Sequence, residues 1–239
     1  MPLLKGCSYI HLMGSAAESQ RTALLAGATG LVGRALLPLL QASPRYERIH
    51  VLVRRAQGDA PANPKTQVHL VDFAKLPAAL PRADDVYIAL GTTIKVAGSE
   101  AAFRQVDFDF VVATAQAAKA AGARRVAVVS SLGADASSRV FYNRVKGDMQ
   151  AALAQIGFDT LCIAQPSLLV GDRAALGQPV RAGEVWATRL LGPFMGLVPR
   201  SVRPIQAGTV AKAMLAASFE AVPGVRILSS AQMQGSGQP

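Results

Sequence analysis

Short apolar runs recur along the chain, and most are separated by longer stretches in which apolar residues fall three or four positions apart. The short runs are typical of buried strands, and the longer pattern is typical of amphipathic helices. Strands are therefore predicted at 22–26, 49–53, 68–71, 86–90, 125–129 and 160–164, with an edge strand at 225–228. Helices are predicted at 31–41, 99–121, 138–155 and 208–219.

This alternation of strands and helices predicts an α/β fold with a mostly parallel sheet covered on both faces. Right-handed crossovers make it a doubly wound sheet of Rossmann type. After Pro166 the pattern loosens: 171–183 is predicted as a loop and 184–191 as a short amphipathic helix. We expect a single dinucleotide-binding domain at 21–231, with a small C-terminal substrate-side region at about 167–205.

The two ends of the chain depart from this pattern. Residues 1–20 lack the long apolar segment of a signal peptide and are predicted to form a flexible extension. Met13 is an alternative start, so whether residues 1–12 belong to the native protein stays open. Residues 232–239, rich in Gly, Gln and Ser, are predicted to be disordered. No apolar run reaches the length of about 18 residues that a transmembrane span needs.

Composition narrows the class of protein. Of 239 residues, 51% are hydrophobic and 17% are charged, which is typical of a globular chain with one large core. The net charge is +10, but the basic residues are scattered, so we expect no nucleic-acid partner. Cys7 and Cys162 lie outside any cluster of metal ligands, so no metal site is expected. Their sparse use fits a reducing, cytoplasmic location.

Glycines follow the first predicted strand at a spacing of three. At a strand-to-helix turn they allow a tight turn, close approach to a pyrophosphate, and close packing of the helix. The helix N-terminus offers unpaired N–H groups and the positive end of its dipole to phosphates. We therefore predict a dinucleotide site at this turn, formed by Gly27, Thr29, Gly30, Leu31, Val32 and Gly33.

The residues after the next strands indicate which dinucleotide binds. Arg54 and Arg55 stand where NAD-selective sites usually carry Asp or Glu. Two guanidinium groups suit a 2′-phosphate, so NADP(H) is predicted over NAD(H). Asp72 follows strand three, and it either accepts from the adenine amino group or serves as a plain turn residue. The same alternative, cofactor contact or ordinary turn, holds for the segment after strand four, Leu90, Gly91 and Thr92.

Tyr142 and Lys146 are four positions apart on a predicted helix, so their side chains share a face. A nearby ammonium group favours the phenolate form of a tyrosine, which helps it exchange a proton with a substrate oxygen. Ser130 and Ser131 end the preceding strand, and either hydroxyl can hydrogen-bond that oxygen. The alternative is an exposed tyrosine beside a solvated lysine, because this spacing also occurs by chance.

Together these residues resemble a protein family. The matching segments, in the family's order, are 27–33 (GATGLVG), 90–93 (LGTT), 106–107 (VD), 129–135 (VSSLGAD), 142–147 (YNRVKG), 165–169 (QPSLL) and 171–173 (GDR). The chain resembles a short-chain dehydrogenase/reductase of the atypical or extended kind, in the HIV-Tat-interacting-protein-like oxidoreductase branch. The resemblance extends from about Thr22 to Phe219.

The resemblance implies an NADPH-binding Rossmann fold with specific roles for its residues. Tyr142 is implied as the acid/base, and Ser131 (or Ser130) as its hydroxyl partner. Lys146 is implied to hold the nicotinamide ribose and assist Tyr142, and backbone near Leu168 to line the nicotinamide. Three positions depart from the family pattern, namely Leu132, Gln165 and Ser167.

The function expected from these features is NADPH-dependent reduction of an unidentified small carbonyl compound, or the reverse oxidation. One alternative is an NADPH-sensing binding module without physiological turnover. Another is a nucleotide-sugar epimerase or dehydratase, which would need a larger substrate region than the chain has after Pro166. A set of apolar residues forms either a substrate pocket wall, part of the core or a homodimer contact: Trp186, Leu190, Phe194, Met195 and Leu197.

Overall fold

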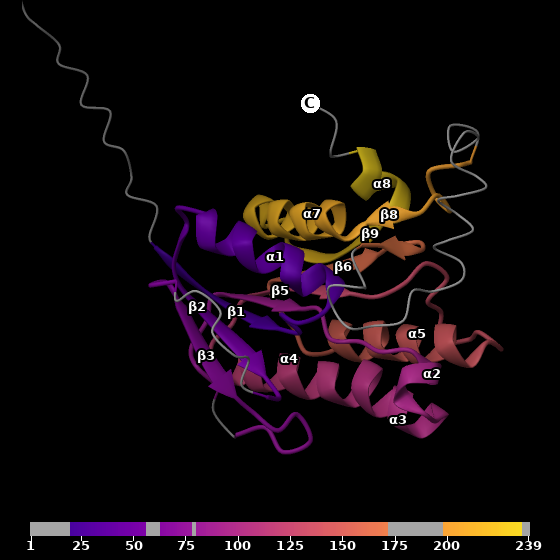
Figure 1. Ribbon diagram of the computed structural model, residues 1–239, viewed down its shortest axis with the longest axis horizontal. Helices are drawn as coiled ribbons and strands as arrows, with labels where there is room; N and C mark the ends of the chain where they lie inside the picture. The colour runs from indigo at the N-terminus through magenta and orange to yellow at the C-terminus, as the bar shows by residue number, and fades with distance from the viewer. Residues whose placement is uncertain (1–19, 56–62, 78–79, 172–197, 236–239) are drawn as a thin grey trace, which may run out of the picture.

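A computed structural model of the chain describes residues 20–55, 63–77, 80–171 and 198–235 (Figure 1). Its centre is a seven-stranded sheet in the order β3-β2-β1-β4-β5-β6-β9, and every neighbouring pair is parallel. The strands are β1 (Arg21–Ala26), β2 (Tyr46–Val53), β3 (Thr66–Leu70), β4 (Asp85–Ile88), β5 (Arg125–Val129), β6 (Thr160–Gln165) and β9 (Gly224–Ser229).

The strand order reverses between β1 and β4, the defining feature of a doubly wound sheet. Helices α1 (Leu31–Ala42) and α7 (Ala207–Glu220) cover one face, and α4 (Phe110–Ala120) and α5 (Phe141–Ala154) cover the other (Figure 1). Successive residues of β1 show why residues 23–26 of this strand are all apolar: Leu25 packs in the α1–α7 layer, and Leu24 packs in the α4–α5 layer. The predicted fold class is confirmed.

The predicted helix at 99–121 is divided into three parts. It consists of α3 (Glu100–Arg104), one π-helical turn, η1 (Gln105–Asp109), and α4. A short helix, α2 (Ile94–Ala97), precedes it and was not predicted. Because apolar periodicity reports an average spacing along a helix, it does not detect a turn that widens locally to hold one more residue. The π turn turns out to matter for the site.

The C-terminal part contains small elements that the sequence pattern did not predict. Strand β7 (Leu169–Val170) pairs with β8 (Ile205–Gln206), apart from the main sheet. The expected loop at 171–183 lies outside the described residues beyond Gly171. So do the helix at 184–191 and the apolar residues from Trp186 to Leu197.

The prediction of a disordered tail is wrong for residues 232–235, which belong to helix α8 (Ser230–Gly235). Met233 is fully buried, and the Gln234 side-chain amide donates to the carbonyls of Arg200 and Arg203 at 2.8 and 3.2 Å. These tertiary contacts hold a segment whose composition alone favours disorder. Residues 1–19 and 236–239 lie outside the described part of the chain.

A buried polar network joins four strands of the sheet at their N-terminal ends. Asp85, on β4, accepts from the Tyr46 hydroxyl at 2.8 Å and from Arg125 Nε at 2.7 Å, and it also pairs with Arg21. Tyr46 and Tyr87 share a further hydrogen bond of 2.8 Å between their hydroxyls. Burial nevertheless raises the pKa of Asp85 above its ordinary value. The network fixes the register of the strands at their N-terminal ends, whereas doubly wound sheets bind ligands at the C-terminal ends.

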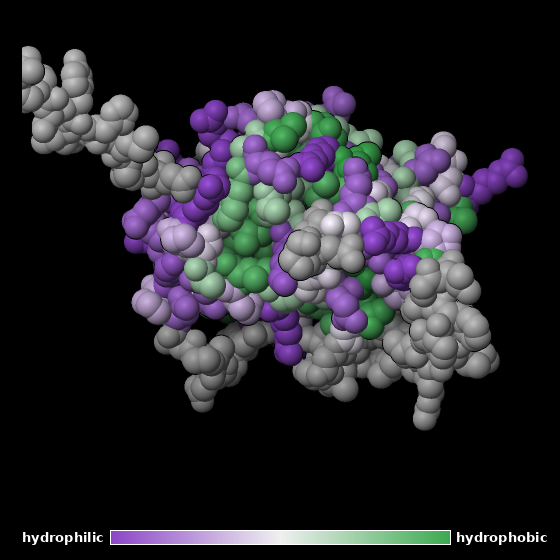
Figure 2. Space-filling model, turned by 90° about the horizontal axis from the view of Figure 1, so that it is seen from above, coloured by the Kyte–Doolittle hydropathy of each residue, from purple (hydrophilic) through white to green (hydrophobic). Residues whose placement is uncertain are grey.

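Seen from above the α1–α7 layer, the surface has hydrophilic residues around its margin and apolar residues between them (Figure 2). Among the described helices, none is long and apolar enough to cross a membrane. The described residues also hold no group of three or more His, Cys, Asp or Glu side chains able to bind a metal ion.

Candidate functional site

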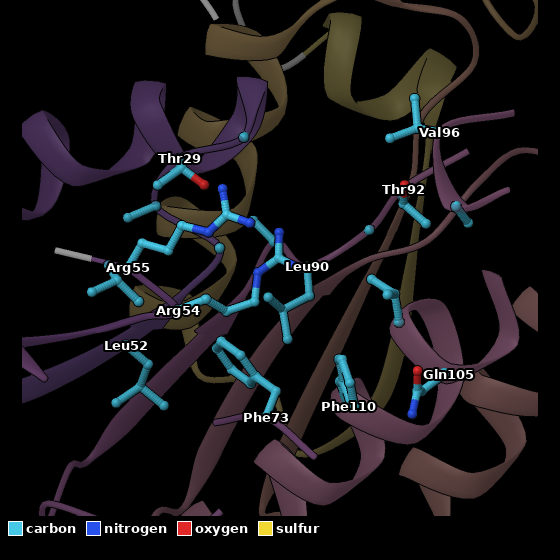
Figure 3. A pocket seen from close by; sticks show the side chains of 18 of the residues that line it. Thr29, Leu52, Arg54, Arg55, Phe73, Leu90, Thr92, Val96, Gln105 and Phe110 are labelled. Carbon is cyan, nitrogen blue, oxygen red and sulfur yellow. The ribbon is translucent and has the colours of Figure 1, made fainter. Parts of the chain in front are cut away.

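A groove of about 850 Å³ opens at the carboxyl ends of the central strands, where the strand order reverses (Figure 3). Its wall consists of the turn after β1, the ends of β2 and β4, the segment after β3, and part of η1 and α4. Nine of the predicted cofactor residues line it: Gly27, Thr29, Gly30, Arg54, Arg55, Asp72, Leu90, Gly91 and Thr92.

The three glycines of the turn meet different steric requirements. Gly27 has φ +91°, and a Cβ there would lie 2.5 Å from the carbonyl oxygen of Ala89 on the chain leaving β4. A Cβ at Gly33 would lie 2.1 Å from the Gly27 carbonyl oxygen, so this glycine lets α1 pack on the turn. At Gly30 the nearest atoms would be at 3.6 Å, an ordinary contact. Contacts within the described chain therefore do not require a glycine at position 30, and Gly30 lines the groove.

Four other predicted cofactor residues are not among those that line the groove. Val32 and Gly33 lie on the buried side of α1. Leu31 is half-buried at the start of α1, and its Cδ2 would lie 2.8 Å from a Cβ at Gly171. Leu168 is half-buried, and its carbonyl accepts from the Ile205 amide at 2.9 Å, which joins it to β8. Their contacts are with other parts of the protein, Leu31 with the chain at Gly171 and Leu168 with β8.

Two arginines dominate the charge of the groove. Arg54 and Arg55 are exposed at the end of β2, and their side chains extend across the groove between Thr29 and Leu90 (Figure 3). Within the described chain neither guanidinium is paired with a carboxylate. The carboxylate of Asp72 also borders the groove, and its Oδ1 accepts from the Ala74 amide at 2.9 Å. This end of the groove can therefore hold an anionic group.

Two aromatic residues at the groove were missed by the sequence reasoning. Phe73 and Phe110 stack with their ring centroids 6.0 Å apart at an interplanar angle of 29°. Both line the groove beneath the arginines (Figure 3). They offer an apolar surface suited to a flat heterocycle. Phe73 follows Asp72 directly, so an aromatic residue just past a strand end was the available signal.

The loop after β5 is held closely against α5. A Cβ at Gly147 would lie 2.0 Å from the Ala136 amide nitrogen, so only glycine permits this approach. The Asp135 amide donates to the Asn143 carbonyl at 3.0 Å. These contacts draw the loop that begins at Ser130 along the first turns of α5, which carry Tyr142 and Lys146.

The two serines at the end of β5 differ in their partners. Ser130 Oγ accepts from the Gln150 side-chain amide at 2.6 Å, and Gln150 in turn accepts from Gln165 at 3.1 Å. Ser131 Oγ is buried and has no hydrogen-bond partner among the described residues. Ser130 therefore belongs to a network between α5 and β6, whereas the Ser131 hydroxyl keeps its capacity to bond a ligand.

Tyr142 and Lys146 occupy different environments on α5. The Tyr142 ring is half-buried and packs on Phe103 of α3, with centroids 5.2 Å apart. Lys146 is buried, and its Nζ lies 2.7 Å from Asp107 Oδ1 in the π turn. Asp107 was quoted in the family pattern but given no role. The signal for it was a carboxylate on a buried stripe, because Phe103 and Val111, four residues to either side, are fully buried.

The profile of the NAD(P)H-binding protein family matches residues 27–158, which include the glycine turn, the groove and all of α5. The chain belongs to this NAD(P)H-binding family. The short-chain dehydrogenase/reductase resemblance is confirmed as well. Protein HTATIP2 of Rattus norvegicus is 34% identical over 82% of this chain and 80% of its own length. Protein FMP52, mitochondrial, of Eremothecium gossypii is 33% identical over 88% of this chain and 95% of its own.

Two solved structures share the fold. The oxidoreductase ylbE from Lactococcus lactis superimposes with a TM-score of 0.59 at 18% identity, covering 90% of this chain and 96% of that one. A UDP-N-acetylglucosamine 4-epimerase from Methanobrevibacter ruminantium superimposes with a TM-score of 0.66 at 14% identity, covering 88% of this chain and 76% of that one. The likeness to these structures shows the fold, and the family match shows that the protein is an NAD(P)H-binding domain. FMP52 is mitochondrial by its name, so it does not confirm the cytoplasmic location expected here.

Proposed function

We propose that this protein is an NADPH-dependent reductase of small carbonyl compounds. The observation that carries the proposal is the arrangement around α5. The unpartnered Ser131 hydroxyl is drawn along the helix that carries Tyr142 and Lys146, next to a dinucleotide groove. Such a site can bind a carbonyl oxygen, donate a proton to it, and hold a dinucleotide beside it.

The groove fits NADPH on two observations. The glycine turn leaves room for a pyrophosphate at Gly30, where the start of α1 has no side-chain cap to occupy its free N–H groups. The guanidinium groups of Arg54 and Arg55, which pair with no carboxylate of the described residues, are suited to a 2′-phosphate. We assign Phe73 and Phe110 to the adenine. Asp72 is a second candidate for the adenine amino group, although its Oδ1 already accepts from a backbone amide.

When bound, the nicotinamide supplies the hydride that reduces the carbonyl carbon. Ser131 holds the carbonyl oxygen through its hydroxyl, and Tyr142 donates its phenolic proton to that oxygen as the alcohol forms. Lys146 holds the nicotinamide ribose and favours the phenolate that is left on Tyr142. The reaction leaves the alcohol and the oxidised dinucleotide, and Tyr142 regains its proton from solvent.

The competing reading is an NADPH-sensing binding module without turnover. It requires the groove but not the Ser131–Tyr142 pair, so the two readings differ in what a change at Tyr142 does. The epimerase among the structural neighbours shows a shared fold and gives no argument for nucleotide-sugar chemistry in this chain. We further propose that the substrate is a small molecule and that the protein is located in the cytoplasm.

Turnover of a panel of aldehydes and ketones with NADPH tests the proposal. We expect Tyr142→Phe to lower kcat by about 100-fold or more, the usual range for losing a general acid, while NADPH affinity stays unchanged. Thermal unfolding of Tyr142→Phe is the control, and it should match wild type because the half-buried ring keeps its packing on Phe103. Full turnover in Tyr142→Phe would exclude Tyr142 as the acid, whereas NADPH binding by the wild type without turnover of any carbonyl would favour the sensing module.

A further inference from the structure

A chain of hydrogen bonds joins the C-terminal helix α8 to segment 166–171, which follows β6 (Figure 1). Gln234 Nε2 donates to Ser230 Oγ at 3.1 Å, and Ser230 Oγ lies 2.9 Å from Ser167 Oγ. Ser167 Oγ in turn donates to the carbonyl of Arg203, two residues before β8. Helix α8 is thus connected both to the chain that leaves β6 and to the chain that enters β8.

The bonds of this chain all run in one direction. A serine hydroxyl has one hydrogen to donate. Because Ser167 donates to the carbonyl of Arg203, the hydrogen shared between the two serines comes from Ser230. Ser230 is fully buried, and its oxygen then accepts from Gln234. Hydrogen bonds aligned in this way strengthen one another, and the Ser230 hydroxyl is the link between Ser167 and α8.

The segment held by α8 runs between two parts of the proposed site. At its start, the Pro166 carbonyl accepts from the Leu132 amide at 2.8 Å, one residue past Ser131. At its end, a Cβ at Gly171 would lie 2.8 Å from Cδ2 of Leu31, the first residue of α1. A dinucleotide with its phosphates at the glycine turn and its nicotinamide beside the serine therefore passes along this segment.

The pairing of β7 with β8 holds the segment only weakly. It consists of two register pairs, Leu169 with Ile205 and Val170 with Gln206, apart from the main sheet. An isolated pair of short strands is marginal in water, so its place depends on tertiary contacts such as those with α8. Met233 is fully buried and anchors α8 by apolar packing, which gives the polar chain a fixed support.

We infer that Ser230 and Gln234 are positioning residues, which hold segment 166–171 in place beside the nicotinamide half of a bound dinucleotide. The inference rests on the proposed function. Both residues act through Ser167, without touching the ligand themselves. A wall that is fixed before the ligand arrives need not be ordered on binding, which raises the affinity for the part of the ligand beside it. Among the described residues, none of the segment lines the groove at the adenosine end, so affinity for that half should not depend on α8.

The test compares two ligands that differ in the nicotinamide half. NADPH contains it, whereas 2′,5′-ADP carries only the adenosine and the 2′-phosphate. For Ser230→Ala we expect calorimetry to show an NADPH affinity lower by about fivefold or more, and a 2′,5′-ADP affinity within about twofold of wild type. Ser218→Ala is the matched control, because it removes another buried hydroxyl, one that donates to the Met214 carbonyl within α7 at 3.2 Å. It should change neither affinity.

Equal losses for both ligands would overturn the inference, because a role in general stability would affect both alike. Unchanged NADPH affinity in Ser230→Ala would overturn it too, and so would the same selective loss in Ser218→Ala. If thermal unfolding shows that Ser230→Ala does not fold, Gln234→Ala takes its place, because this half-buried side chain begins the same chain of bonds. The same selective loss is then expected. A wild-type protein that binds neither ligand would instead refute the proposed function, and the inference with it.

Discussion

Two glycines three positions apart offer a test that separates the steric needs of the fold from those of the ligand. Gly33→Ala would place a methyl carbon 2.1 Å from the Gly27 carbonyl oxygen, whereas ordinary contact begins at 3.4 Å. The atoms in the way are backbone, so α1 and the turn must separate by about 1.3 Å. Overpacking of this kind costs about 3 kcal/mol, and alanine in a helix regains about 1 kcal/mol. The expected net loss is about 2 kcal/mol.

Gly30→Ala is the matched variant. Its new methyl group would meet protein atoms only at 3.6 Å, and φ −81° with ψ 171° is open to alanine. Its stability should therefore stay within about 1 kcal/mol of wild type, the range for a change at a helix N-cap. The same methyl group would enter the groove where a pyrophosphate approaches the backbone, so NADPH affinity should fall by about tenfold or more.

Urea unfolding and calorimetric titration with NADPH measure the two effects separately. Gly33→Ala should lower the urea midpoint by about 1 M, and Gly30→Ala should leave it almost unchanged. The reasoning is refuted if Gly33→Ala is as stable as wild type, since the short contact would then be relieved without cost. It is equally refuted if Gly30→Ala binds NADPH normally, because no close approach to the backbone would then be needed.

Two further predictions concern the arginines of the groove and a buried histidine. Replacing Arg54 and Arg55 together with alanine should weaken NADPH by about 10- to 100-fold and NADH by less than about twofold, measured by calorimetry; equal weakening would contradict 2′-phosphate recognition. Burial, and to a lesser degree His69 and Arg48, lowers the pKa of His50 from 6.5 to about 4. Between these values the unfolded chain takes up a proton that the folded chain does not. The free energy of unfolding therefore falls as the pH is lowered, by about 1–2 kcal/mol after solvent screening. Urea midpoints at pH 7 and 5 should show a smaller loss in His50→Gln than in wild type; identical losses would place the effect elsewhere.

The sequence alone was enough for the sheet and the nucleotide turn, because both depend on local patterns. The part of a strand that is buried on both faces must be apolar, as at 23–26 in β1 and 126–129 in β5, and such runs are visible in the sequence. The glycine spacing after β1 reflects contacts made within a few residues, such as that between Gly33 and Gly27. The residues at strand ends, including Arg54 and Gly91, could be placed at the groove because parallel strands end at one edge.

Other features were decided by contacts between segments distant in the sequence. Helix α8 is ordered because Met233 is buried and Gln234 reaches the carbonyl of Arg203, which composition does not reveal. The difference between Ser130 and Ser131 depends on Gln150, which lies 20 residues further along the chain, and this contact exists only once α5 packs beside β5.

Asp107 shows most clearly what the sequence determines and what only the tertiary structure decides. The sequence showed a carboxylate on an apolar stripe, which by itself marks an exception to burial rules. Only the tertiary structure placed it 2.7 Å from Lys146 on another helix, through a π turn that leaves no trace in apolar periodicity. Local patterning thus determined which elements form and where their ends meet, because it follows from backbone geometry and burial. The pairing of charges was decided by packing, because a side chain's partner depends on which elements become neighbours.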